Sequence, residues 1–138
     1  MKTKKMINYK SIFVSDGQKD TMQFKVIGEY IENEKTMIRF SHEDLHVQIA
    51  YKNDDIYLKN NDSLLHLNKD VMIENDYKVA YGSFVLKTKV LMFEANDSHI
   101  KLKYELYQQD TLVSTVYILV GMSDIEEEML INWLKNFK

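Results

Sequence analysis

The residues with the clearest potential for chemistry are His42 and His46, which flank Glu43 in the segment His-Glu-Asp-Leu-His. The spacing matches the His-Glu-x-x-His pattern of zinc-dependent proteases, in which a helix turns both histidines toward the metal and the glutamate activates a water. Here the flanking residues 35–41 and 47–51 alternate between apolar and polar side chains, as strands do. No third histidine follows at the spacing that such proteases use. We therefore expect a polar hairpin turn and no bound metal.

Other catalytic arrangements are missing from the sequence. The chain has no cysteine, which excludes thiol catalysis, disulfides and cysteine-ligated metals. None of its four glycines belongs to a phosphate-binding loop. His66 and His99 are isolated in the sequence, and no order of serine, histidine and aspartate suggests a triad. We expect a protein that is not an enzyme and has no cofactor.

The charge balance argues against nucleic-acid and membrane partners. The 18 basic and 21 acidic residues give a net charge of -3, so no long-range positive field attracts an anionic polymer. One face of a predicted hairpin carries four lysines that could contact a single strand, but Glu105 lowers its charge: Lys87, Lys89, Lys101 and Lys103. No apolar stretch is long enough to span a bilayer. We expect a cytoplasmic protein that binds neither nucleic acid nor membrane.

Apolar and polar side chains alternate with period two along most of the 138 residues, and this pattern predicts antiparallel strands in one domain. Asp16 and Gly17 predict a tight hairpin turn, and Gly28 predicts a bulge or bend at which the sheet curls. The expected strands are 4–14, 21–31, 35–41, 45–51, 56–59, 64–68, 71–81, 83–95, 99–108 and 111–120. Together they predict an all-β fold over residues 1–120, a single antiparallel barrel of about 8–10 strands.

The clearest hairpin joins 83–95 to 99–108. If paired residue numbers sum to 194, the inward pairs are Met92 with Leu102, Val90 with Tyr104, and Thr88 with Leu106. Leu91 and Phe93 then fall on the lysine face, where another element would have to cover their apolar side chains.

Residues 123–137 predict an amphipathic helix that begins with a capping box formed by Ser123 and Glu126. Its apolar stripe is formed by Met129, Trp133 and Phe137. We expect this stripe to cover Leu91, Phe93 or the strand 111–120, which is apolar on both faces, or else to contact a partner.

Several short motifs carry a family resemblance through their order and spacing. They are Ile27-Gly28-Glu29, Phe40-x-x-Glu43, Tyr77-x-x-x-Tyr81-Gly82, Leu86-x-Thr88, Ile100-x-Leu102-x-Tyr104-x-Leu106 and Leu112-x-Ser114. From about Lys4 to Val120 the chain resembles the YwiB-like family of small bacterial proteins of unknown function, described as calycin-like β-barrels. The resemblance implies a barrel similar in outline to lipocalins and fatty-acid-binding proteins, and it implies no reaction and no catalytic residues.

A barrel of this size can hold one small ligand among its inward side chains. Tyr30, Thr88 and Tyr104 are the polar members of otherwise apolar inward rows and could orient a mostly apolar molecule. The alternative is that they bond to backbone or water inside a filled core. We expect a small apolar ligand in the barrel or at its mouth. A homodimer or protein-interaction module that uses a strand edge or the Trp133 and Phe137 helix face is the alternative function.

Overall fold

Ten antiparallel strands and one helix make up the computed structural model, which describes residues 1–125 and 127–136. The elements are β1 (Lys2–Ser15), β2 (Gln18–Glu32), β3 (Thr36–His42), β4 (Leu45–Lys52), β5 (Asp55–Asn60), β6 (Ser63–Asn68), β7 (Ile73–Val79), β8 (Gly82–Ala95), β9 (His99–Gln108), β10 (Thr111–Ser123) and α1 (Glu127–Lys135). Every expected strand is present, and the predicted antiparallel all-β architecture is confirmed.

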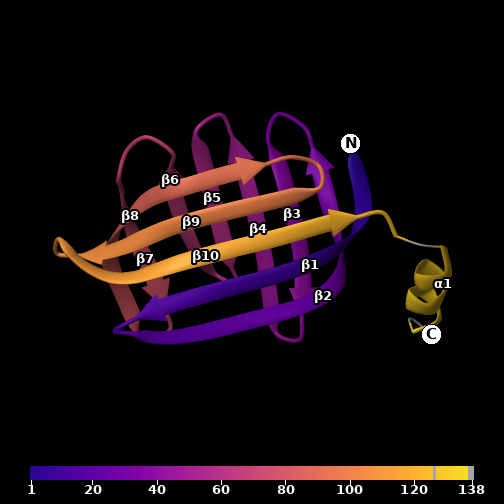
Figure 1. The fold of residues 1–138 in the computed structure, drawn as a ribbon, viewed down its shortest axis with the longest axis horizontal. Coiled ribbons are helices and arrows are strands. Elements are labelled where there is room, and N and C mark those ends of the chain that lie inside the picture. Colours follow the sequence, from indigo (N-terminus) through magenta and orange to yellow (C-terminus); the bar gives the residue numbers. More distant parts are fainter. Residues whose placement is uncertain (126, 137–138) are drawn as a thin grey trace.

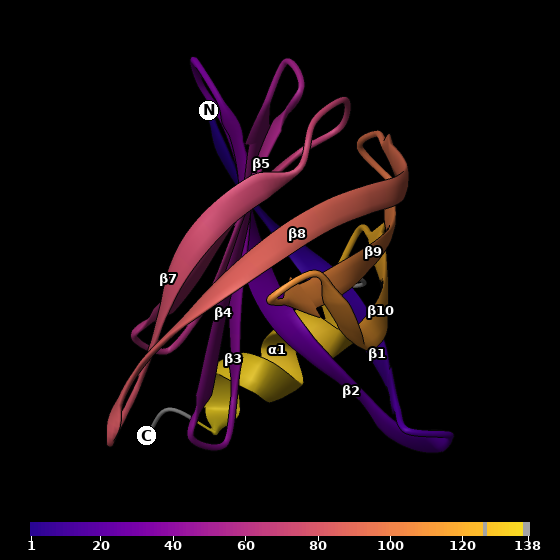
Figure 2. The ribbon, with the colours of Figure 1, turned by 90° about the vertical axis from the view of Figure 1, so that its left-hand side faces the viewer.

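The strands form a single sheet in the order β6-β5-β4-β3-β2-β1-β10-β9-β8-β7. Strands β1 to β6 pair in chain order, as do β7 to β10, and the first strand also pairs with the last, whereas β6 and β7 form the two ends of the sheet. Strands β1, β9 and β10 cross in front of β3, β4 and β5 at a steep angle, and the view along the barrel shows β7 and β8 returning toward β5 (Figures 1 and 2). Because β6 comes to lie beside β7 and β8, the sheet is a nearly closed barrel.

The turn between β1 and β2 sets which side chains point inward. Asp16 and Gly17 both have positive φ, 49° and 75°, as a two-residue hairpin turn requires. The resulting register places Tyr9 opposite Phe24, with ring centroids 5.1 Å apart. Both rings therefore point inward and join the apolar core that fills much of the barrel.

At Gly28, atoms of β1 and β3 lie close to the backbone of β2. A Cβ atom there would lie 2.8 Å from the Arg39 carbonyl oxygen, 2.8 Å from Ile7 Cγ1 and 2.9 Å from Phe40 Cβ. The ladder between β1 and β2 continues through Gly28 without a shift, so of the two predicted alternatives, a bulge or a bend, the bulge is excluded. β3 pairs with β2 only from Glu29 onward, and glycine is required because no side chain fits inside this bend.

The seam between β6 and β7 is held by side chains, because none of the ladders among the described strands joins these two. The Asn75 amide donates to the His66 carbonyl oxygen at 2.9 Å and accepts from the His66 amide nitrogen at 2.8 Å. Thr88 Oγ1 lies 3.0 Å from the same carbonyl oxygen, and Ser63 Oγ donates to the Lys78 carbonyl oxygen at 2.8 Å. These bonds close the barrel wall.

A β-bulge at Leu91 corrects the predicted register of the long hairpin. Val90 pairs with Tyr104 as expected, but Met92 pairs with Lys103. The extra residue resets the alternation, so Phe93 turns inward opposite Leu102 and contacts the Tyr51 ring at 5.4 Å. Leu91 and Met92 are each 43% exposed, and Phe93 is covered by the core and needs no helix.

The helix α1 is shorter than expected and covers neither Leu91 nor the outer face of β10. Ser123 is the last residue of β10 and pairs with Met6, so it does not cap a helix, and Glu126 lies outside the described residues. Leu119 on the outer face of β10 stays exposed. The helix lies beside the barrel, beyond the end of β10 (Figure 1). Neither α1 nor any other helical segment among the described residues has the length and apolar character to cross a bilayer.

Candidate ligand-binding cavity

The segment around His42 and His46 forms the hairpin turn between β3 and β4, as predicted. Glu43 has a positive φ of 54°, so the segment cannot continue as a helix. The His42 ring stacks on Phe24 at 4.3 Å, whereas His46 Nδ1 lies 2.7 Å from Ser41 Oγ on the opposite face of the strands. The two histidines do not converge, and no group of three or more potential ligands for a metal occurs in the part of the chain that the structure describes.

One end of the barrel contains a cavity of about 390 Å³. Its walls come from seven strands and consist mainly of aliphatic and aromatic side chains. The lining residues are Tyr9, Ser11, Phe13, Asn60, Leu65, Tyr77, Val79, Phe84, Leu86, Tyr104, Leu106, Val113, Ser114, Val116 and Ile118. Few of these residues are polar and none of them is charged, a composition typical of sites for small apolar ligands.

The cavity has a buried floor and an exposed mouth. Tyr104 and Tyr9 on the floor are only 5% and 4% exposed. Phe13 and Phe84 at the rim are 40% and 39% exposed, although both belong to the lining. Aromatic rings that are open to solvent at the entrance of an apolar cavity give a ligand a continuous apolar path from the surface to the floor.

Tyr104 is one of three buried residues with hydroxyl groups at the floor, together with Tyr9 and Ser114. Every fully buried side-chain nitrogen or oxygen among the described residues has a hydrogen-bond partner. The Tyr104 hydroxyl has no such partner among these residues, so its oxygen is not fully buried. Its oxygen is therefore accessible from the cavity. Burial raises the pKa of Tyr104 far above its usual range, and the neighbouring Tyr9 and Tyr77 hydroxyls raise that pKa further. This phenol stays neutral throughout the physiological pH range.

The structure brings only one of the three expected ligand residues to this cavity. Tyr104 lines it, but Thr88 is fully buried in the seam, where its hydroxyl is satisfied by backbone carbonyl oxygens. Tyr30 pairs with Thr3, eight residues along β1 from the lining residue Ser11. Burial raises the pKa of Tyr30, which lies with Tyr51 toward the other end of the barrel. Thr88 therefore follows the alternative interpretation, in which an inward polar side chain bonds to the backbone.

The other polar groups of the cavity were not predicted from the sequence. Tyr9 and Ser11 alternate with Phe13 on β1, and the Asp16-Gly17 turn would have identified this row as inward through its register with Phe24. Ser114 was harder to predict, because a bulge at Val113 interrupts the alternation of β10 directly before it. Tyr77 belongs to β7, whose sequence alternates least clearly.

The expected interaction face on the helix is described only in part. The Lys4 ammonium group lies over the Trp133 ring, 4.9 Å from its centroid, and Lys5 Nζ lies 2.9 Å from Asp124 Oδ1 in the segment before α1. The Met129 side chain and all of Phe137 lie outside the described residues. Ile131 and Leu134 are 46% and 55% exposed.

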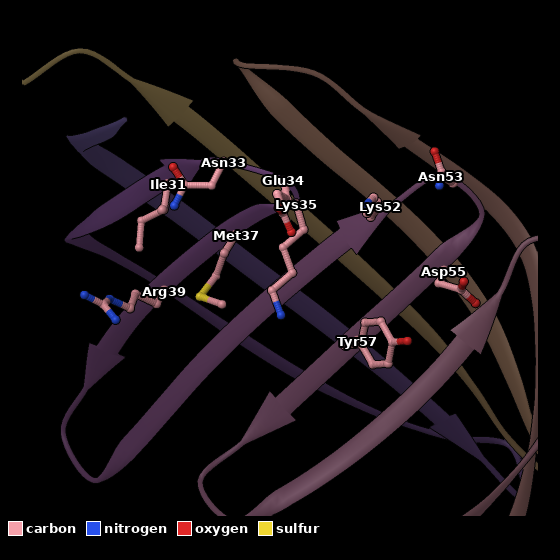
Figure 3. A pocket seen from close by; sticks show the side chains of 10 residues that line it. All are labelled: Ile31, Asn33, Glu34, Lys35, Met37, Arg39, Lys52, Asn53, Asp55 and Tyr57. Atoms are coloured by element: carbon pink, nitrogen blue, oxygen red, sulfur yellow. The ribbon is translucent and has the colours of Figure 1, made fainter.

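A larger hollow of about 760 Å³ lies on the outer face of β2 to β5 (Figure 3). Met37, Lys35 and Tyr57 point out of the sheet there, and charged side chains surround them. Arg39 Nε donates to Glu29 Oε1 at 2.8 Å, and Asp55 Oδ1 lies 2.8 Å from His66 Nε2. This hollow lies on the outer face of the sheet and is lined by charged side chains, so the uncharged interior cavity is the better candidate site for an apolar ligand.

The lysine face of β8 and β9 also carries compensating groups. Lys87 Nζ donates to Asp110 Oδ1 at 3.1 Å, and Lys89 pairs with Glu105 across the two strands. Lys103 Nζ lies 5.0 Å from the centroid of the Tyr117 ring. The face therefore presents mixed charge and partly covers the outer apolar residues of β10.

These features define a class of protein, a nearly closed antiparallel barrel with an uncharged apolar cavity at one end. The sequence profile described as "Domain of unknown function (DUF1934)" matches residues 7–119, and the chain belongs to this family. The crystal structure of ywiB protein from Bacillus subtilis is similar, with a TM-score of 0.66 and 14% sequence identity over 88% of this chain and 93% of that chain. At this identity the similarity shows the fold alone, and it confirms the YwiB-like resemblance. No curated protein matches the chain.

Proposed function

We propose that this protein binds a small, largely apolar molecule in the cavity at the end of the barrel and does not catalyse a reaction. The observation that carries the proposal is the cavity itself, with about 390 Å³ of space above a buried floor. Pockets for small molecules generally have about 300–1,000 Å³ and an apolar lining with few polar groups. A filled core would leave no such space.

The arrangement of the lining favours binding over catalysis. Among the described residues that line the cavity there is no histidine, aspartate, glutamate or lysine, so no pair of these groups can exchange protons as acid and base. The order of the strands, in which each except β6 pairs with the next along the chain and β10 pairs with β1, supports the calycin-like type of barrel that the resemblance implied. We also propose a cytoplasmic location, since a chain without cysteine needs no oxidising compartment.

Binding of an uncharged fluorescent probe, N-phenyl-1-naphthylamine, tests the proposal. We expect saturable binding that falls at least tenfold in the variant Ser114→Phe, because the new ring occupies the cavity. Thr115→Phe is the matched control, since Thr115 is the next residue of β10 and faces the outside opposite Glu105. Far-UV circular dichroism checks the fold of each variant, and Ser11→Phe fills the same cavity from β1 if Ser114→Phe does not fold.

Equal probe binding by Ser114→Phe, Ser11→Phe and Thr115→Phe, with all three folded, would place the probe elsewhere and overturn the proposal. Native mass spectrometry of the purified full-length chain adds an independent measurement. A retained small molecule that is lost from Ser114→Phe supports the cavity as the natural site.

Association through the helix is the second candidate function, favoured by the exposed Ile131 and Leu134 side chains. The strand-edge form of this alternative has less support, because β6 and β7, the two ends of the sheet, are joined to each other by the Asn75 and Ser63 bonds. The same native mass spectrum tests association. A dimer that Leu134→Glu converts to a monomer would favour this second function.

A further inference from the structure

We propose that the ligand of the cavity is an uncharged molecule with one hydrogen-bonding group at its inner end, held beside the Tyr104 hydroxyl, and an apolar remainder that points toward Phe13 and Phe84. This inference rests on the proposed function and names the class of ligand that the same cavity accepts. It distinguishes neutral alcohols, ketones and esters from ionised fatty acids of the same length.

The exclusion of charge follows from the lining. All fifteen side chains that form the cavity are aliphatic, aromatic, hydroxyl or amide groups. An ionised carboxylate that enters such a site loses its water and gains no cationic partner, which opposes binding strongly. The floor residues Tyr104 and Ser114 are each 5% exposed, so little water could accompany the charge.

The inner polar group follows from the Tyr104 hydroxyl. That oxygen has no hydrogen-bond partner among the described residues, and Tyr104 is a buried residue that lines the cavity. A neutral phenol can both donate and accept a hydrogen bond, so it matches a hydroxyl or a carbonyl group equally well. An apolar ligand end at this position would instead leave the phenol without a partner.

The orientation follows from the gradient in exposure. The half-exposed rings of Phe13 and Phe84 form the mouth, and the buried aliphatic side chains of Val116 and Ile118 also line the cavity. Apolar chains lose contact with water along this wall. A molecule with its polar group outward would place that group between aromatic rings and its apolar end against the phenol, so the inward orientation is favoured.

Displacement of N-phenyl-1-naphthylamine by two ten-carbon competitors tests the inference with the full chain at pH 8. 1-Decanol is uncharged and decanoate is ionised, and the two have the same number of carbons. We expect decanol to displace the probe at a concentration at least tenfold lower than decanoate. We expect Tyr104→Phe to weaken displacement by decanol about five- to tenfold, the usual effect of losing one hydrogen bond, whereas Tyr117→Phe on the outer face leaves it unchanged.

Each outcome separates this inference from the function on which it rests. If decanol and decanoate displace the probe equally, the cavity binds apolar molecules but the exclusion of charge is wrong. If decanol is preferred and Tyr104→Phe binds it as well as the wild type does, the inner hydrogen bond is wrong. If the probe itself does not bind to the cavity, the proposed function fails first.

Discussion

The Asn75 side chain pairs with the His66 backbone as a neighbouring strand would. Its carboxamide nitrogen donates to the His66 carbonyl oxygen at 2.9 Å, and its carboxamide oxygen accepts from the His66 amide nitrogen at 2.8 Å. One side chain thereby satisfies both polar groups of a residue at the edge of β6. The adjoining residues Leu65 and Tyr77 line the cavity, so this contact closes the wall directly beside the candidate site.

Replacement of Asn75 should therefore open the seam. We expect Asn75→Ala to lower the free energy of unfolding by about 2–4 kcal/mol, because two hydrogen bonds to His66 are lost and its amide nitrogen is left unpaired, while its carbonyl oxygen keeps only the Thr88 hydroxyl. Urea unfolding followed by circular dichroism measures this change. Asp76→Ala is the matched control, since Asp76 is the next residue and exposed, and it should change the value by less than about 0.5 kcal/mol. Equal effects of the two substitutions would show that the Asn75 contact contributes nothing specific.

A second prediction concerns the bend at Gly28. We expect Gly28→Ala to lower the free energy of unfolding by about 1–3 kcal/mol, the usual cost of excess volume in a packed core. The new methyl group would lie within 3.0 Å of atoms from both β1 and β3. Gly121→Ala is the control, because its Cβ would lie 3.6 Å from the nearest atom, an ordinary contact. If Gly28→Ala unfolds at the same urea concentration as Gly121→Ala, the close approach of the three strands is not as the structure shows it.

Local signals in the sequence were sufficient to predict most of the fold. The turn at Asp16 and Gly17 and the period-two alternation depend on residues that are adjacent in the chain, and they define β1, β2 and their register. The bulge at Leu91 is a single inserted residue, and its sequence signal was the apparent misplacement of Leu91 and Phe93 on the polar face. An interruption in the alternation is itself evidence for a bulge.

The site was less predictable because it depends on closure between distant strands. Thr88 was correctly predicted to point inward, but its partner is the backbone of His66, 22 residues away in the chain. The cavity forms where the C-terminal part of β1 and the N-terminal part of β10 meet β7 and β8. Alternation along one strand does not reveal how far the neighbouring side chains fill that space. Tyr104 could be predicted as inward, but the space beside it could not.

The bulge makes a prediction that separates the observed register from the regular one. We expect Phe93→Ala to lower the free energy of unfolding by about 2–3 kcal/mol, somewhat less than a fully buried phenylalanine, because its ring packs on Tyr51 and the core. Leu91→Ala should cost less than about 1 kcal/mol, since Leu91 is exposed. The regular register would place both side chains on the same outer face. Similar small losses for both variants would therefore contradict the bulge.

The last prediction concerns stability in alkaline solution. Burial raises the pKa of Tyr51 to about 12, and the nearby Tyr30 hydroxyl adds to this increase. In the unfolded chain tyrosine ionises near pH 10, so the stabilisation linked to this group is complete below pH 10 and is lost as the pH rises toward 12. We expect the free energy of unfolding of the wild type to fall between pH 10 and 11.5, and to fall less steeply in Tyr51→Phe. Urea unfolding at half-unit pH intervals measures both slopes, and absorbance at 295 nm reports tyrosine ionisation in the folded protein. Identical slopes in the two proteins would show that Tyr51 ionises equally well in the folded and unfolded states, which its packing against Phe93 argues against.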